Sequence, residues 1–130
     1  MIETDAIHFA VSQSGETADT LAAVKEIQLK GGEVRGVINV VGSTIARQCG
    51  RGCYIHSGPE QSVASTKAFS NMVAALSMFA IQIGRARSLS REKGRRLTKS
   101  LQKVPQLVDE YLSNPGPIDE VVDMVKGAKS

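Results

Sequence analysis

The chain has 130 residues, of which 42% are hydrophobic and 22% are charged, and its formal net charge is +3. This length supports one domain with a packed core, and the composition is that of a globular protein rather than a disordered one. No apolar run is long enough to cross a bilayer, and the first fifteen residues lack the regions of a secretory signal peptide. We therefore expect a cytoplasmic protein with no membrane partner.

The positive charge is concentrated in residues 85–103, which hold eight basic residues and one acidic residue. This segment carries +7, which leaves −4 for the rest of the chain. A basic cluster can attract nucleic acid or an acidic partner, but no aromatic side chain is interleaved here to stack on a base. The pattern favours a solvated helix face, and we do not expect nucleic acid as a partner.

Two cysteines, Cys49 and Cys53, and two histidines, His8 and His56, are the candidates for a metal site. A zinc site needs about four ligands at characteristic spacing, and only His8 and His56 are left to complete one beside the cysteines. We therefore expect no metal ion and no cofactor. Both cysteines are interpreted as reduced structural thiols.

The first elements that the sequence predicts are a strand and a helix. Residues 7–11 form a short apolar run, typical of a strand that is covered on both faces. Apolar positions at helical spacing then predict a helix over residues 17–30, ended by Gly31 and Gly32. The polar sequence 12–17 between them is therefore placed at the carboxyl end of a strand and at the amino end of a helix.

The alternation of strand and helix continues along the chain. Residues 34–40 and 53–56 predict two further strands, and a short helix between them is expected to be capped by Ser43 or Thr44. Strands joined by short helical connections pair in parallel with right-handed crossovers. The sequence thus predicts an α/β fold with a three-stranded parallel sheet and flanking helices.

The remainder of the chain is predicted to be helical. Residues 69–83 are apolar nearly all round, which predicts a largely buried helix. A later apolar stripe is interrupted by Pro105, where we expect a kink or a restart, and Pro117 is expected to open a last helix. The C-terminal helices, residues 91–130, would then pack on the domain formed by residues 1–90 or on a partner.

The sequence Ser12-Gln13-Ser14-Gly15-Glu16-Thr17 has the composition of an anion-binding turn. Hydroxyl and amide groups beside the unpaired N–H groups of a helix amino terminus can hold a phosphate without a metal ion. The glycine spacing and the Lys-Ser/Thr pair of a Walker loop are missing, which argues against a nucleotide triphosphatase. A structural alternative stays open, in which Ser14 or Thr17 only caps the helix and Gly15 only makes the turn.

A second hydroxyl-rich sequence, Val63-Ala64-Ser65-Thr66, opens the long helix after another predicted strand. Loops that follow neighbouring strands of one parallel sheet border one crevice at its carboxyl edge. A small phosphorylated ligand with several hydroxyl groups would fit between them. The alternative is that Ser65 or Thr66 only caps the long helix.

Ser-Gln-Ser-Gly-Glu-Thr at 12–17 and Val-Ala-Ser-Thr-Lys-Ala-Phe at 63–69 resemble motifs of a known family. They are similar to the first sugar isomerase (SIS) domain of glucosamine-6-phosphate synthases, the glutamine:fructose-6-phosphate amidotransferases. The resemblance runs from about residue 7 to residue 112 and includes Val-Gly-Ser-Thr-Ile-Ala-Arg at 41–47. It implies a partial flavodoxin-like SIS domain.

This resemblance also implies which residues hold the ligand. Phosphate binding is implied for the side chains of Ser12, Gln13, Ser14 and Thr17. Sugar contacts are implied for the Val63 backbone and the Ser65 hydroxyl. The sequence patterns point to the same two loops.

The implied function is to bind fructose 6-phosphate within the isomerase part of an enzyme of amino-sugar biosynthesis. In the family, a second SIS domain supplies an acid/base glutamate and a lysine, and a glutaminase domain supplies a cysteine nucleophile. These parts, and the first two strands of a SIS sheet, are expected outside this sequence. We therefore assign no catalytic residue and expect the chain alone to be inactive. The alternative function is a non-catalytic SIS module that senses a phosphosugar.

Two further expectations concern departures from the family pattern. Gln61 and Ser62 stand where the family usually has an aliphatic residue and a glycine, so we expect a change in the backbone of the loop or in its fit to the ligand. A strand with a neighbour on one side only would leave an open sheet edge near residues 7–11. Such an edge predicts a homo-oligomer, or assembly with a complementing fragment.

Overall fold

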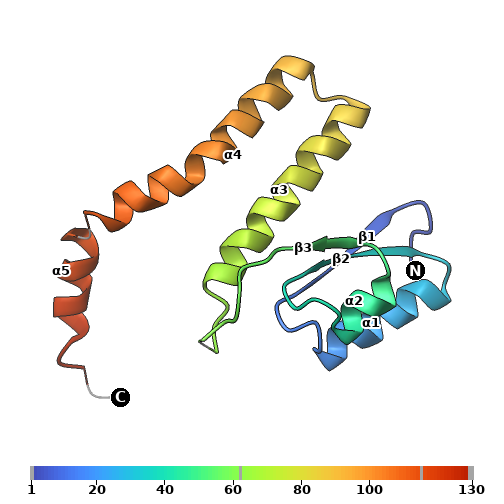
Figure 1. The fold of residues 1–130 in the computed structure, drawn as a ribbon, viewed down its shortest axis with the longest axis horizontal. Coiled ribbons are helices and arrows are strands. Elements are labelled where there is room, and N and C mark those ends of the chain that lie inside the picture. The colour runs from blue at the N-terminus through green and yellow to red at the C-terminus, as the bar shows by residue number, and fades with distance from the viewer. Residues whose placement is uncertain (1, 62, 115, 129–130) are drawn as a thin grey trace. The chain divides into compact units, whose positions relative to one another are not determined.

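The computed structural model describes residues 2–61, 63–114 and 116–128 (Figure 1). The chain divides into two compact units, Met1–Ile83 and Gly84–Ser130. Each unit is described by itself. Among the described residues, no helix is both long enough and apolar enough to cross a membrane.

The first unit contains a three-stranded parallel sheet with the strand order β1-β2-β3. The strands are β1 (Ile7–Ser12), β2 (Glu33–Ile38) and β3 (Gly52–Tyr54). In the register of the sheet, Ser12 lies opposite Ile38, and Ile38 lies opposite Tyr54. The carboxyl ends of all three strands therefore meet at one edge of the sheet, which confirms the predicted parallel α/β arrangement.

Two helices, α1 (Ala18–Leu29) and α2 (Thr44–Cys49), cover one face of this sheet (Figure 1). Both helices follow a strand directly, so their apolar sides return to the sheet as in other βαβ units. Their buried side chains join those of β1 and β2 in one hydrophobic core. This core consists of Ala10, Val24, Val34, Ile38, Ile45 and Cys49.

Helix α3 (Lys67–Arg87) is less buried than its apolar sequence predicted. Phe79 packs against Phe9 of β1 with 5.1 Å between the ring centroids. Phe69 and Met78, however, are 62% and 58% exposed. A helix that meets a sheet along one stripe buries only that stripe, so the prediction of a largely buried helix is wrong for the described residues.

The second unit is helical and contains α4 (Arg91–Leu112) and α5 (Gly116–Val125). Ser90 caps α4, because its hydroxyl accepts a hydrogen bond of 3.2 Å from the Lys93 N–H. Pro105 lies inside α4, so of the predicted kink or restart the restart is wrong and the kink stays a prediction. Proline removes one backbone donor, and the helix continues on both sides of it.

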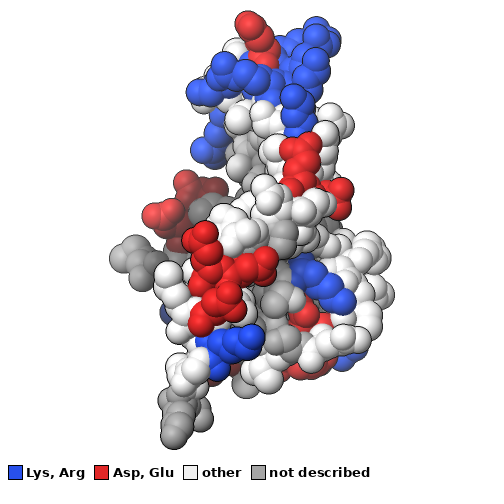
Figure 2. All heavy atoms as spheres, turned by 90° about the vertical axis from the view of Figure 1, so that its left-hand side faces the viewer, with Lys and Arg blue, Asp and Glu red and all other residues white. Residues whose placement is uncertain are grey.

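The basic residues of 85–103 fall at the start of α4 and just before it. Figure 2 shows Lys and Arg side chains gathered together there. The apolar side chains of α4 and α5 are largely exposed as well, among them Val104, Val108 and Val121. The second unit therefore presents both a basic face and apolar surface.

Candidate functional site

Both predicted ligand loops lie at the carboxyl edge of the sheet. The first loop, residues 12–17, leaves β1 and enters α1, and the second loop, residues 55–66, leaves β3 and enters α3. Because the strands are parallel, this is the edge at which open α/β sheets bind ligands. The first loop holds Ser12, Gln13, Ser14 and Thr17, and the second holds Val63 and Ser65.

The hydroxyl groups of the first loop are held by its own backbone. The Gly15 N–H donates to Ser12 Oγ at 3.0 Å, and the Glu16 N–H donates to Ser14 Oγ at 3.2 Å. Each hydroxyl acts as an acceptor in these bonds, so each still has a proton that it can donate. Both side chains are thereby fixed in place with a donor left for an anion.

The amino terminus of α1 tests the alternative that Ser14 or Thr17 only caps this helix. Thr17 occupies the N-cap position, but within the described chain its side chain makes no capping hydrogen bond. Ser14 Oγ accepts from the Glu16 N–H, which lies before α1. Thr17 is thus the N-cap residue of α1 by position, and its hydroxyl is not used in a capping hydrogen bond within the described residues. The first N–H groups of the helix and its dipole remain attractive to an anion.

The first loop is anchored to the start of α2. Glu16 Oε1 accepts a hydrogen bond of 2.8 Å from the Thr44 N–H, and the Gly15 carbonyl accepts one of 2.9 Å from the Ile45 N–H. Ser43 stands at the N-cap of α2, but its side chain makes no capping hydrogen bond in the described structure. The prediction that Ser43 or Thr44 caps this helix is confirmed for the position of Ser43, while the side-chain hydrogen bond to the Thr44 N–H comes from the distant Glu16.

The electrostatic state of Glu16 follows from this contact. Its hydrogen bonds with Thr44 hold the pKa of the carboxyl below its ordinary value, and the charge of Arg47 adds to the effect. Arg47 itself donates to the Gly42 carbonyl and, at 3.2 Å, to Thr44 Oγ1. Glu16 is thus an ionised group that joins the phosphate-loop candidate to α2.

Gly15 is required by a close approach between this loop and α2. It has a φ of 67°, which glycine adopts readily. A Cβ at this position would lie 1.9 Å from Ser43 Oγ. Ser43 Oγ is buried and has no hydrogen-bond partner among the described residues. The loop therefore sits directly on the N-cap residue of α2.

The second loop is held at both of its ends. At the start, Asn39 accepts hydrogen bonds from Ser57 and donates one to the Gly58 carbonyl. At the end, the Glu60 carboxylate accepts from Thr66 Oγ1 at 3.2 Å and from the Ala68 N–H at 3.4 Å. Glu60 therefore supplies a carboxylate to the first turn of α3.

The two loops share a hollow of about 340 Å³. Its lining residues are Gln13, Asn39, Val40, His56, Gly58 and Pro59. Gln13 is the predicted site residue that lines it. Val63 and Ser65 are exposed farther along the second loop, and Ser62 lies outside the described residues. The expected effect of Gln61 and Ser62 on the backbone of this loop stays a prediction.

Glu16, Asn39 and Glu60 are organising residues that sequence reasoning did not single out. Their partners lie 28, 18 to 19, and 6 to 8 positions away. Of the three, Asn39 left a trace in the sequence, since it is a polar residue at the end of an apolar strand.

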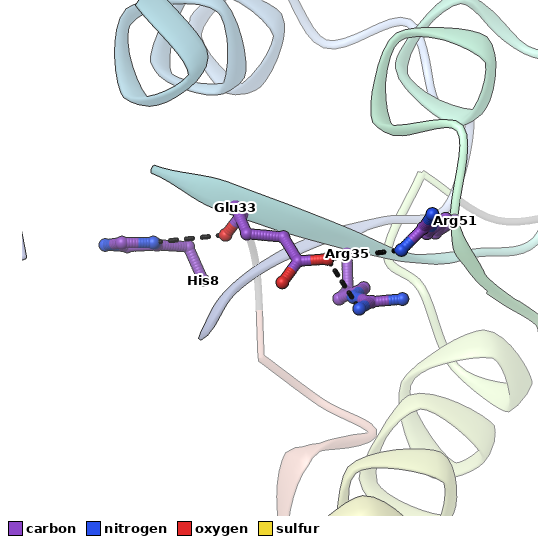
Figure 3. A network of polar contacts seen from close by, with 4 residues as sticks. All are labelled: His8, Glu33, Arg35 and Arg51. Carbon is purple, nitrogen blue, oxygen red and sulfur yellow. Dashed lines mark hydrogen bonds and ion pairs between the residues drawn. The ribbon is translucent and has the colours of Figure 1, made fainter. Parts of the chain in front are cut away.

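The amino edge of the sheet carries a different polar cluster (Figure 3). His8 Nδ1 lies 3.2 Å from the Glu33 carbonyl, and the Glu33 carboxylate lies 2.5 Å from Arg35 and 3.7 Å from Arg51. Exposed ion pairs of this kind contribute about 0–1 kcal/mol to stability. We therefore interpret the cluster as an exposed ion-pair network with a small effect on stability and no role in ligand binding.

The candidates for metal binding do not come together. Among the described residues, no group of three or more His, Cys, Asp or Glu side chains could hold a metal ion. Cys49 and Cys53 are free cysteines, and burial raises the pKa of both thiols. A raised pKa keeps them as thiols, which are weaker nucleophiles and metal ligands than thiolates.

Comparisons with known proteins agree with this geometry. The SIS domain family matches residues 1–82. Over the chain, the glutamine–fructose-6-phosphate aminotransferases of Thermus thermophilus and Chlorobaculum tepidum are 39% and 42% identical. The alignments cover 99% and 100% of this chain but 22% and 21% of those proteins. The chain thus spans about a fifth of the length of the curated relatives it matches.

A solved structure extends the agreement to the fold. The C-terminal domain of glucosamine-fructose-6-phosphate aminotransferase from Francisella tularensis is 28% identical and superimposes with a TM-score of 0.89. The match covers 98% of this chain and 37% of that one. The resemblance found in the two sequence motifs is therefore confirmed by the sequence matches and by the fold.

Proposed function

Because this chain belongs to the SIS domain family, we propose that its carboxyl-edge loops bind a sugar phosphate, with fructose 6-phosphate as the ligand. The similar proteins described above support this choice, since they are glutamine–fructose-6-phosphate aminotransferases. The proposed role is to hold the substrate in the isomerase part of an enzyme of amino-sugar biosynthesis.

The observation that carries the proposal is the construction of the first loop. Ser12 and Ser14 accept hydrogen bonds from loop amides and keep their protons for an anion. The Thr17 side chain makes no capping hydrogen bond within the described residues, so its hydroxyl and the first amides of the helix can face the same phosphate. Gln13 lines the hollow shared with the second loop and adds an amide donor.

The second loop is proposed to contact the sugar rather than the phosphate. The Val63 backbone and the Ser65 hydroxyl offer neutral polar groups, which suit sugar hydroxyls. Both residues are exposed, so a ligand can reach them. A phosphate at the first loop would place the sugar across the hollow toward this segment.

We assign no catalytic role to any residue of this chain. The role proposed for its residues is positioning, which lowers a barrier by fixing the reacting geometry. Binding, rather than turnover, is therefore the property to measure for the chain itself.

The test is a calorimetric titration with fructose 6-phosphate and, separately, with unphosphorylated fructose. We expect binding of the phosphorylated sugar alone. Ser14→Ala and Thr17→Ala should each weaken it about tenfold or more, since a hydrogen bond to a charged group contributes about 1.5–3 kcal/mol. Ser100→Ala on α4 is the matched control, because its exposed hydroxyl lies in the second unit. Equal responses to the two sugars, or no response to either, would overturn the proposal.

A further inference from the structure

We propose that Asn39 is a positioning residue that holds the sugar-contacting loop in register with the phosphate-binding loop. This inference rests on the proposed function and deepens it. Asn39 directly follows β2, the central strand of the sheet, and therefore lies between the two loops.

The contacts of Asn39 reach both loops. Its backbone N–H donates to the Ser12 carbonyl at 3.3 Å, at the start of the first loop. Its side-chain Nδ2 donates to the Gly58 carbonyl at 2.8 Å, and its Oδ1 accepts from the Ser57 N–H and Ser57 Oγ, both at 2.9 Å. One residue thus ties together segments that are more than forty positions apart.

Because Asn39 is buried, its hydrogen bonds restrict where the backbone of the second loop can lie. Asn39 is 8% exposed, and a buried polar group that loses its partner costs more free energy than the hydrogen bond itself contributes. The Ser57 and Gly58 backbone must therefore stay where the amide can pair with it. The start of the second loop is fixed by this requirement.

The chemistry of the site demands an amide. The Ser57 N–H needs an acceptor, and the Gly58 carbonyl needs a donor. An aspartate has the same shape, but when ionised it would place an oxygen against the Gly58 carbonyl oxygen. Asn39→Asp therefore keeps the bonds from Ser57 and replaces the bond to Gly58 with repulsion.

The side-chain contacts of Asn39 indicate a positioning role. Two donors occupy Oδ1, and one of the two N–H groups of Nδ2 donates to the Gly58 carbonyl, so these hydrogen bonds of the side chain all go to the second loop. The loop that Asn39 holds at its start is held at its end by Glu60, which accepts from Thr66 and Ala68. Ser65 lies between these two fixed points, so its position depends on both.

The two halves of the ligand should respond differently to a change at Asn39. The bond from the Asn39 N–H to Ser12 belongs to the backbone and survives any substitution except proline. The internal bonds of the first loop do not involve the Asn39 side chain either. Loss of the side chain should therefore disturb sugar recognition and spare phosphate recognition.

The experiment compares fructose 6-phosphate with inorganic phosphate as probes for the full chain. Asn39→Ala and Asn39→Asp should weaken fructose 6-phosphate binding about ten- to hundredfold, because a displaced loop loses its hydrogen bonds to the sugar and each 1.4 kcal/mol lost is about tenfold in affinity. Inorganic phosphate should bind within about twofold of its original affinity. Ser57→Ala removes one of the bonds and should give the same pattern with a smaller loss, and it serves if the Asn39 variants do not fold.

Gln28→Ala is the matched control. Gln28 is also an amide side chain that joins two elements, since it donates to the Gln48 carbonyl at 2.9 Å and accepts from Gln48 Nε2 at 2.7 Å. It lies near the start of β2, at the opposite edge of the sheet. This variant should lower the melting temperature and leave the affinities for both probes unchanged.

A double-mutant cycle with Ser65→Ala separates positioning from general loosening of the fold. If Asn39 acts through Ser65, the double variant should lose little more affinity than the weaker-binding single variant. Additive losses, or an equal loss for inorganic phosphate, would overturn the inference while leaving the proposed function intact. A wild-type chain that does not prefer fructose 6-phosphate over fructose would overturn the proposed function, and this inference with it.

Discussion

The two edges of the parallel sheet both carry polar residues, but these residues are held differently. At the carboxyl edge, Ser12 and Asn39 are buried, and their side chains bond to backbone groups of the loops that follow. At the amino edge, Glu33 meets Arg35 and Arg51 in ion pairs whose side chains are 30% to 72% exposed. Buried hydrogen bonds fix a loop in one conformation, whereas exposed ion pairs are weak and mobile. The difference supports a binding role for the carboxyl edge alone.

The carboxyl edge should be disrupted most by Gly15→Ala. The residue has a φ of 67°, and a new Cβ would lie 1.9 Å from Ser43 Oγ and 2.5 Å from Ser43 Cβ. Because conformation and contact both oppose the change, we expect the free energy of unfolding to fall by about 2–4 kcal/mol. Phosphate binding should be lost with it. Urea unfolding and titration with inorganic phosphate measure the two effects.

Gly42→Ala is the matched control for this substitution. Gly42 has a similar φ of 72°, but a Cβ there would meet no atom of the described residues within 4 Å. The loss of stability should therefore be about 1 kcal/mol, from the backbone conformation alone. Equal losses for the two variants would contradict the importance of the contact with Ser43.

A smaller, pH-dependent effect is expected from Glu16→Gln. Its hydrogen bonds with Thr44 lower the pKa of Glu16, so the ionised carboxylate stabilises the folded chain above the ordinary glutamate pKa of about 4.3. That stability is lost as the pH falls through the lowered pKa of the folded state. Wild type should therefore exceed Glu16→Gln in stability at pH 7, and the gap should narrow toward pH 3. Urea unfolding across this range is the measurement.

Glu16→Asp tests whether the hydrogen bond or the charge alone produces this effect. The shorter side chain keeps the negative charge near α2 but cannot reach the Thr44 N–H from the same backbone position. We expect it to behave like Glu16→Gln. A full wild-type pH response in Glu16→Asp would mean that charge near the helix suffices and that the bond to Thr44 is not needed.

The sheet could be predicted from the sequence because strands and helices are marked by local patterns of apolar residues. Apolar runs alternate with helical periodicity up to residue 56, and such a pattern allows few topologies. The polar loops were placed at the carboxyl edge for the same reason. Element ends differed by a few residues, as where β2 stops at Ile38 and polar Asn39 leaves the strand.

Contacts between distant residues were beyond sequence reasoning. Glu16 reaches Thr44 across 28 positions, and no local pattern pairs a carboxylate with a particular helix start so far away. The exposure of Phe69 shows the same limit, since an apolar sequence does not tell which segment covers it. Local chemistry thus located the candidate site, and tertiary contacts determine how its loops are held.

A substitution at the amino edge of the sheet is expected to change stability least, in contrast to the substitutions at the carboxyl edge. Glu33→Gln removes both ion pairs, with Arg35 and with Arg51. The side chain of Glu33 is 48% exposed, so water and salt screen its charge, and we expect a loss of no more than about 0.5 kcal/mol in the free energy of unfolding. Fructose 6-phosphate affinity should not change. Urea unfolding at low and high salt, with titration alongside, checks both statements. A loss comparable to that of Gly15→Ala, or weakened ligand binding, would show that the two edges are coupled and that the contrast between them does not hold.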